Sequence, residues 1–195
     1  MSDARASIID AAFRLFLEKG YDGTSLNRIL DEVPFSKGAL YHHFKNKEAL
    51  LDAVIERFFS TSLVDPVRPR PATPLALAHR LVDDYVDAVE SISAIASPLA
   101  YYSFLIQVAP RVQPALNAAR VHIDDELSTA LGALLPADPD AARVIAADLT
   151  ALVEGAGLLD VLLQRVPDRE HLHERVDGLV RAHLAARGVA LPVME

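Results

Sequence analysis

Residues 36–47 have the sequence SKGALYHHFKNK, and this short stretch decides how the rest of the chain is interpreted. It carries three lysines and no acidic residue. Ser36 is a suitable N-cap, because its hydroxyl can accept a backbone N–H that is left unpaired in the first turn of a helix. On a helical wheel Leu40 and Phe44 share one face, and Gly38 lies on the opposite one. A helix this short is not stable alone in water, so we expect other helices to hold it while its polar face is displayed.

The charge of the chain is unevenly distributed. A net charge of −8 over 195 residues argues, taken alone, against a nucleic-acid partner. Residues 1–50, however, hold seven Lys or Arg and seven Asp or Glu, so the whole net charge belongs to the residues after position 50. All four lysines of the chain also lie in these first fifty residues. We therefore expect only this part of the chain to face phosphate.

The composition excludes several classes of protein. Cysteine is absent, which rules out a disulfide framework, a thiol nucleophile and a cysteine-based zinc site. Hydrophobic residues make up 51% of the chain, enough for a substantial core. No basic-then-apolar leader opens the sequence, and its first apolar residues are already periodic, so we expect a cytoplasmic protein.

The residues before this stretch predict two helices that would support it. An apolar stripe at i, i+4, i+7 and i+8 predicts a helix over residues 3–19, with Gly20 as its left-handed cap. Thr24 and Ser25 offer an N-cap for a short helix over residues 26–32, which Pro34 must end. Helix, short break and helix is the spacing of a helix-turn-helix unit, and the first helix supplies its apolar cover.

The remaining residues predict further helices. A helix over residues 46–63 is followed by four prolines within residues 65–74, which form the clearest linker in the chain. Residues 75–135 are expected to form helices separated by three prolines, Pro98, Pro110 and Pro114. The fold class predicted from these patterns is all-α.

The last two expected helices, over residues 141–166 and 168–187, have the pattern of an interface between subunits. The first is apolar nearly all the way round, so it must be covered on two sides. Its small residues would let a facing helix approach closely. Two such helices from each of two subunits would form a four-helix interface, so we expect a homodimer, with ordinary packing within one chain as the alternative.

Residues 91–110 carry no charge, and a membrane span is one interpretation of such a run. Because four serines and a proline interrupt it, we favour instead helices around an internal cavity that binds a small molecule, and no membrane partner. The candidate effector-binding residues are mostly aromatic: Phe58, Tyr85, Tyr101, Tyr102, Phe104 and Gln107. The alternative for any one of them is a role in the core.

An enzymatic function finds no support in the sequence. A Gly-rich phosphate loop, the nucleophile motif G-x-S-x-G and the zinc motif H-E-x-x-H are all absent. His171 and His173 are two positions apart, which places them on different faces of a helix and disfavours a metal site. We therefore expect no catalytic residue, no metal and no cofactor.

Three features recur together in the first fifty residues: the apolar stripe of the first helix, the turn GYDGTS at residues 20–25, and SKGALYHHFKNKEAL at residues 36–50. In these features the chain resembles the N-terminal region of TetR-family transcriptional repressors. The resemblance implies about nine helices, with a helix-turn-helix domain over residues 1–47 and a helical ligand-binding and dimerisation domain over residues 48–195. Pro-Phe at positions 34 and 35 stands where the family usually has glycine and an aliphatic residue, so we expect a slightly re-angled turn.

The candidate DNA-binding residues fall into two groups. Phosphate contacts are expected from three lysines and from amides at two helix N-termini, at Lys37, Lys45, Lys47, Ser25 and Ser36. Base contacts are expected from one face of the third helix, with accessory contacts from the second helix; the candidates are Lys37, Gly38, Ala39, His42, Asn27 and Arg28. The resemblance further implies that Tyr41 and His43 reach the DNA backbone. Packing is the alternative for His43, and a solvated surface position is the alternative for His42.

These observations predict a homodimeric, ligand-responsive regulator that binds double-stranded operator DNA and is released from it by a small effector. The expected action is repression, although binding to DNA is equally compatible with activation. A protein of another class, a helical small-molecule binding or scavenging protein with an incidental basic helix, is the alternative. The identity of the effector and the sequence of the operator do not follow from the residues.

Overall fold

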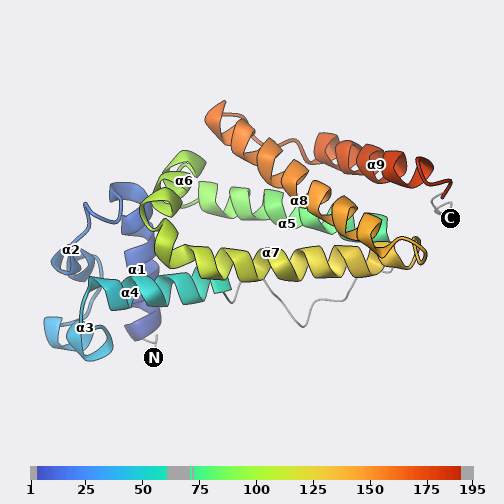
Figure 1. Ribbon diagram of the computed structural model, residues 1–195. Helices are drawn as coiled ribbons and strands as arrows, with labels where there is room; N and C mark the ends of the chain where they lie inside the picture. Colours follow the sequence, from blue (N-terminus) through green and yellow to red (C-terminus); the bar gives the residue numbers. More distant parts are fainter. Residues whose placement is uncertain (1–3, 61–70, 72, 190–195) are drawn as a thin grey trace. The chain divides into compact units, whose positions relative to one another are not determined.

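The computed structural model of the chain describes residues 4–60, 71 and 73–189, and this part contains nine α-helices, one π-helical turn and no strand (Figure 1). The first elements are α1 (Ala4–Lys19), α2 (Leu26–Asp31), α3 (Lys37–His43), α4 (Lys47–Ile55) and the π-helical turn η1 (Glu56–Ser60). The later ones are α5 (Pro74–Ser93), α6 (Pro98–Gln107), α7 (Ala109–Gly132), α8 (Pro139–Leu162) and α9 (Arg169–Ala185). The all-α prediction is confirmed. Most of the linker expected at residues 65–74 lies outside the described residues.

The chain divides into two compact units. Unit 1 consists of residues 1–66 and 91–119, and unit 2 consists of residues 67–90 and 120–195. Unit 1 thus contains α1–α4 together with α6 and the first part of α7. The helix-turn-helix therefore shares its compact body with helices that come much later in the chain.

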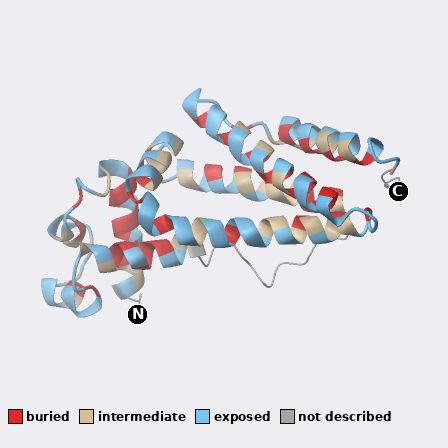
Figure 2. Cartoon of the chain, viewed as in Figure 1, coloured by how far each residue is buried: buried red, intermediate tan, exposed pale blue. Residues whose placement is uncertain are grey.

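The core of unit 1 is rich in aromatic side chains. Buried positions gather along α1 and α4 (Figure 2). Phe13 and Phe16 of α1 are buried, as are Phe59 of η1 and Phe104 of α6. The Phe16 and Phe104 rings are stacked with their centroids 6.0 Å apart, and the Phe13 ring meets the Phe59 ring edge-on at 6.2 Å. Such pairs bury large apolar areas and prefer these geometries. The Phe16–Phe104 pair joins α1 to α6, which lies nearly ninety positions further along the chain.

The core of unit 2 is aliphatic and is built from α5, α7, α8 and α9. Val82, Leu149 and Val176 are completely buried in it. Gly157 of α8 lies directly against the Tyr85 side chain of α5, where a β-carbon on residue 157 would overlap the phenol ring. This glycine is therefore required by the close approach of a neighbouring side chain.

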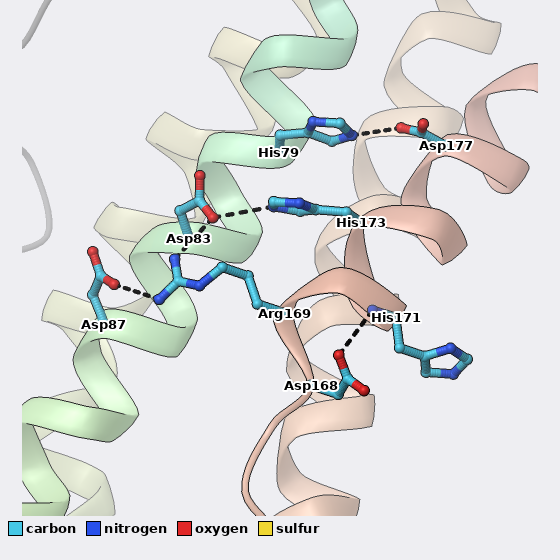
Figure 3. Close-up of polar contacts among 8 residues, drawn as sticks. All are labelled: His79, Asp83, Asp87, Asp168, Arg169, His171, His173 and Asp177. Atoms are coloured by element: carbon cyan, nitrogen blue, oxygen red, sulfur yellow. Dashed lines mark hydrogen bonds and ion pairs between the residues drawn. The ribbon is translucent and has the colours of Figure 1, made fainter.

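Charged side chains join α5 to α9 along one edge of unit 2 (Figure 3). Arg169 donates to Asp83 Oδ1 at 2.9 Å and to Asp87 Oδ1 at 2.7 Å. The hydrogen bond to Asp87 and, less strongly, that to Asp83 raise the pKa of the Arg169 guanidinium. Desolvation has the opposite but smaller effect. Arg169 is the first residue of α9, and Asp168 caps the helix.

Two histidines extend this network. The imidazole rings of His79 and His173 are stacked with their centroids 4.3 Å apart, and each ring has its own carboxylate partner (Figure 3). His79 Nε2 lies 2.6 Å from Asp177 Oδ1, and His173 Nε2 lies 3.1 Å from Asp83 Oδ1. Among the described residues, no group of three or more His, Asp or Glu side chains is arranged so that it could hold a metal ion. His173 of α9 contacts His79 and Asp83 of α5.

The predicted helix breaks at Pro110 and Pro114 are absent, so these two predictions are wrong. Pro110 and Pro114 both lie within α7, which runs without interruption from Ala109 to Gly132. Pro110 is in the first turn, where a backbone N–H has no partner within the helix. Pro114 removes only the hydrogen bond to the carbonyl of residue 110, and a long helix tolerates this loss near its start. Pro98, in contrast, begins α6, with Ser97 as its N-cap.

Other helix ends differ from the prediction by a few residues. α4 passes at Ile55 into a π-helical turn, and residues 61–63 of the expected helix lie outside the described part of the chain. α8 ends at Leu162, four residues before the predicted end, and Gln164 takes a positive φ of 53°. The Arg165 N–H donates to the Asp160 carbonyl at 2.8 Å and the Gln164 N–H donates to the Val161 carbonyl at 3.1 Å, so the left-handed Gln164 closes the C-terminus of α8.

The uncharged run at residues 91–110 is divided between the end of α5, a short connection, α6 and the start of α7. In the described part of the chain no single helix has both the length and the apolar character of a membrane span, although the broken pair α5 and α6 has them in combination.

Candidate nucleic-acid interface

Both N-caps predicted for the helix-turn-helix are confirmed. The Ser25 hydroxyl accepts the Arg28 N–H at 3.2 Å, and the Ser36 hydroxyl accepts the Ala39 N–H at 3.2 Å. Two buried residues, Ile29 of α2 and Leu40 of α3, attach these short helices to the core of unit 1. Each helix is too short to persist alone, so these caps and anchors determine its position.

α3 presents the predicted polar face to solvent. Lys37, Gly38 and His42 are exposed, and Tyr41 remains 44% exposed despite its aromatic ring. The Lys37 ammonium lies 5.8 Å from the centroid of the Tyr41 ring, which places a cation beside a large displayed side chain. Ala39 is half-buried at the edge of this face. The arrangement places one positive charge, one aromatic ring and the imidazole of His42 on one face of α3, and a second exposed imidazole, that of His43, follows on the same helix.

Gly38 has no structural requirement within the described residues. A β-carbon at this position would meet only Ser36 Oγ, at an ordinary contact distance of 3.7 Å. Glycine in a helix costs about 1 kcal/mol relative to alanine. Because the fold does not need this glycine, its cost is explained if the backbone must approach another molecule closely.

The other candidate residues surround this face with different degrees of exposure. Asn27 and Arg28 of α2 and Lys45 after α3 are exposed, as are the two capping serines. His43 is also exposed, and its ring centroid lies 5.2 Å from that of His42 and 6.2 Å from that of the buried Phe44. The structure thus brings most of the candidate DNA-binding residues to the surface of α2 and α3.

Lys47 is different, because its ammonium is engaged inside the protein. It donates to the Tyr21 carbonyl at 2.6 Å and to the Thr24 carbonyl at 2.9 Å. It also lies 4.1 Å from the centroid of the Tyr21 ring, in a cation–π contact. The first residue of α4 therefore holds the turn between α1 and α2, a role that the sequence pattern did not predict.

That turn is ordered by further contacts. Gly20 ends α1 with a φ of 77°, as predicted, and the buried Thr24 hydroxyl lies 2.9 Å from the Gly20 carbonyl oxygen and 3.2 Å from the Leu15 carbonyl oxygen. Burial and, less strongly, the charge of Glu48 raise the pKa of the Tyr21 phenol, so that the ring stays neutral beside the Lys47 ammonium. The sequence suggested Thr24 only as a possible cap; the structure makes it a buried support of the turn.

The comparison with known families agrees with this geometry. The sequence model described as "Bacterial regulatory proteins, tetR family" matches residues 8–54, which contain α2, α3 and most of α1 and α4. The helix-turn-helix region of the chain is thus similar in sequence to that of TetR-family regulators. The matched residues include both capping serines, the exposed face of α3 and Lys47.

Individual proteins resemble this chain either in sequence or in three-dimensional structure. The biofilm operon regulator IcaR of Staphylococcus epidermidis is 47% identical over 53 residues, which are 27% of this chain and 29% of IcaR. A TetR-family regulator from Cytophaga hutchinsonii has a similar fold with a TM-score of 0.69 at 23% identity, covering 97% of this chain and 96% of that one. A regulator from Saccharomonospora viridis in complex with choline gives a TM-score of 0.65 at 19% identity, covering 98% and 100%.

The chain spans less than half the length of the curated relatives that it matches. Sequence similarity to them is thus concentrated in the helix-turn-helix part of the chain. The similarity to solved structures extends over nearly the whole chain and shows a common fold.

The candidate effector-binding residues are placed in both units. Five of them belong to unit 1: Phe58, Tyr101, Tyr102, Phe104 and Gln107. Phe104 is fully buried in the aromatic core, and Phe58 stacks on Phe13 at 4.1 Å. Tyr101 stacks on Phe59 at 6.0 Å, and burial raises the pKa of its phenol. The sixth, Tyr85, lies in unit 2 against Gly157. Contact of these residues with an effector stays a prediction.

A shallow groove of about 270 Å³ opens on unit 2 between α7 and α8. Its lining consists of Val121, Asp124, Asp125, Ser128 and Arg143. Four of these five residues are charged or polar, and Arg143 forms an ion pair with Asp140 of its own helix at 2.8 Å. None of the six candidate effector-binding residues lines this groove.

Proposed function

We propose that this chain is a sequence-specific DNA-binding transcriptional regulator that responds to a small effector, acting most simply as a cytoplasmic repressor. In this role the protein would bind DNA and the effector without catalysing a reaction on either. The observation that carries it is the exposed face of α3, where Lys37, Tyr41 and His42 surround a glycine that the fold does not require. An α-helix fits the major groove of B-DNA, where hydrogen-bonding groups of the bases can be distinguished.

The two groups of candidate residues would have different roles on DNA. Lys37, Lys45 and the N-terminal amides of α2 and α3 suit phosphate, and contacts of this kind fix the position of the protein. His42 and the backbone at Gly38 suit the edges of bases or a thymine methyl group. Since one copy of α3 offers few side chains to the bases, specificity would depend on two copies.

We further propose a homodimer formed through α8 and α9, within the predicted ranges 141–166 and 168–187. A stripe at spacings of four and three along α8 is exposed, and apart from Asp148 its members are small or apolar: Val144, Ala151, Gly155, Leu158 and Leu162. On α9 exposed small residues recur at Gly178, Ala182 and Ala185. Small residues allow helices to approach closely, and a twofold dimer would present two α3 helices to half-sites about 34–36 Å apart.

Two relatives support ligand-responsive repression. IcaR is described as a negative transcriptional regulator, and the Saccharomonospora viridis regulator was crystallised with choline. For this chain we propose a weakly polar organic effector, in keeping with the tyrosine, phenylalanine and glutamine side chains suggested from the sequence. An effector would release the DNA only to the extent that it binds the DNA-free conformation more tightly.

Selection of binding sites from random duplex DNA, followed by fluorescence anisotropy at several salt concentrations, tests the DNA-binding function. The wild-type protein should enrich a symmetric site, and its affinity should fall steeply as salt rises. Gly38→Ala should weaken binding to the enriched site while leaving the fold as stable as before, or up to about 1 kcal/mol more stable.

Two lysines on exposed surfaces provide a matched pair. Lys37→Ala should weaken binding, whereas Lys19→Ala, at the end of α1, should have little effect. Equal losses for both variants would show that only general charge matters, and failure to enrich any site would favour the alternative, a small-molecule binding protein without operator function. Such a protein would still gain thermal stability from its ligand.

The dimer is tested separately by light scattering coupled to size-exclusion chromatography. Leu158→Glu places a charge on the proposed interface and should give a monomer. Val121→Glu places the same charge on another exposed apolar position, in α7, and should leave the dimer intact. A monomeric wild-type protein, or a dimer that survives Leu158→Glu, would contradict this interface.

A further inference from the structure

The backbone of Tyr21 is held from two sides by helices that lie far from it in sequence. Its N–H donates to Gln107 Oε1 at 2.9 Å, and its carbonyl accepts from Lys47 Nζ at 2.6 Å. Gln107 is the last residue of α6, and Lys47 is the first residue of α4. One residue in the turn before α2 is therefore fixed by both helices.

The neighbouring glycine makes room for the glutamine. Gly20 has a φ of 77°, a conformation that favours glycine. A β-carbon at this position would also lie 3.1 Å from Gln107 Oε1 and 3.3 Å from Gln107 Nε2, closer than ordinary contact. Glycine is therefore required at position 20 for two separate reasons: the positive φ and the space that the Gln107 amide occupies.

The position of this turn determines where α2 and α3 begin. Only Thr24 and the capping Ser25 separate the held turn from α2, and Thr24 is itself buried beneath it. The α6 side of the contact is also well anchored, because Phe104, one turn before Gln107, stacks on Phe16 of α1. A rigid α6 therefore presents Gln107 to a turn that is close to the DNA-facing helices.

We propose that Gln107 is a positioning residue for DNA binding: by accepting the Tyr21 N–H it fixes the turn from which the helix-turn-helix starts. This inference rests on the proposed DNA-binding function. Gln107 lies more than fifty residues beyond the matched family region, 8–54, and would not contact DNA itself. The sequence had suggested it only as a wall of an effector cavity.

Three variants separate the hydrogen bond from other properties of the side chain. Gln107→Met keeps the length of the side chain but removes the acceptor. Gln107→Glu keeps an oxygen acceptor for the Tyr21 N–H but adds a negative charge. Gln113, another exposed glutamine of unit 1, provides the charge control through Gln113→Glu.

The experiment measures two quantities on each full-length variant: the exchange rate of the Tyr21 amide hydrogen by NMR, and the affinity for DNA enriched with the wild-type protein. For Gln107→Met we expect faster Tyr21 exchange and an affinity about 3- to 10-fold lower, the range for loss of one hydrogen bond. Gln107→Glu should keep wild-type exchange and should match Gln113→Glu in affinity.

Two results would overturn the positioning role while the proposed function stands. One is faster Tyr21 exchange in Gln107→Met with unchanged DNA affinity, and the other is an equal loss of affinity in Gln107→Met and Gln107→Glu beyond that of Gln113→Glu. Failure of the proposed function is a distinct result, since the wild-type protein would then enrich no DNA and the positioning role would fall with it.

Discussion

The ammonium of Lys47 lies 4.1 Å from the centroid of the Tyr21 ring and donates a 2.6 Å hydrogen bond to the carbonyl of the same residue. A lysine beside a DNA-facing helix is expected to bind phosphate, yet this ammonium is already held by two carbonyls and an aromatic ring. Lys45, two residues earlier, is exposed to solvent. The two lysines therefore predict different consequences of substitution.

Lys47→Ala should destabilise the protein by about 1.5–3 kcal/mol, the range for hydrogen bonds to a charged group. Because the turn before α2 would lose its support, DNA affinity should also fall, but the dependence of log affinity on log salt should keep its slope. Lys45→Ala should leave stability unchanged and make that slope shallower by about 0.9, the value for one phosphate contact. Thermal unfolding and anisotropy titrations measure both; a shallower slope for Lys47→Ala would show that Lys47 leaves the turn to bind phosphate.

Local features of unit 1 were predictable from the sequence, and long-range ones were not. The capping roles of Ser25 and Ser36 could be predicted because capping depends on only three or four consecutive residues. The Tyr21–Gln107 hydrogen bond joins residues 86 positions apart, and nothing in either neighbourhood identifies the partner. The contacts of Lys47 were unpredictable for a related reason: composition indicates a positive charge but not which carbonyls surround it.

The prolines show the opposite error, in which a local rule was applied too strongly. Pro114 was expected to separate helices, but α7 continues through it. A proline near the start of a helix loses a single hydrogen bond, and packing along the rest of a 24-residue helix compensates for it. Local propensity is therefore a reliable guide at caps and a weaker one inside long, well-packed helices.

Gly157→Ala should destabilise unit 2, because the added methyl group would overlap the Tyr85 ring. Insertion of one methyl group into a packed site commonly costs about 1–3 kcal/mol, and here neither α5 nor α8 can move without disturbing buried neighbours. Chemical denaturation measures the loss. Gly132→Ala is the matched control, since nothing lies within 4 Å of a β-carbon there and helix propensity should leave the variant as stable as wild type or more so. Equal stability of the two variants would mean that Tyr85 moves away freely.

Arg169→Gln should lower the melting temperature by disconnecting α9 from Asp83 and Asp87 of α5. The stacked pair of His79 and His173 depends on the same two helices, so the loss should exceed that of a single surface ion pair. The effect should shrink between about 50 mM and 1 M salt, because screening weakens exposed charges.

Arg143→Gln is the control for this network. Arg143 pairs with Asp140 of its own helix, and the two side chains are 73% and 87% exposed, so its replacement should change the melting temperature little. Similar small shifts for Arg169→Gln and Arg143→Gln at low salt would show that the contact between α5 and α9 does not depend on its charges.

Glu154 of α8 gives the stability of the protein a specific dependence on pH. Desolvation, partly offset by Arg120 and increased by Asp124, raises the pKa of its carboxyl above the ordinary value of 4.5. A carboxyl whose pKa is raised by folding supports stability while it is protonated, and this support is lost as pH rises through the folded-state pKa. Ionised Glu154 is therefore unfavourable at neutral pH.

Glu154→Gln should raise the melting temperature at pH 7–8 by the equivalent of less than about 1 kcal/mol, since the side chain is partly solvated, and the gain should vanish near pH 4. Glu174→Gln, whose wild-type side chain is 75% exposed on α9, should show no gain at neutral pH that disappears in acid. A gain for Glu154→Gln that is the same at both pH values would point to the loss of a charge in general, and not to the desolvated carboxyl.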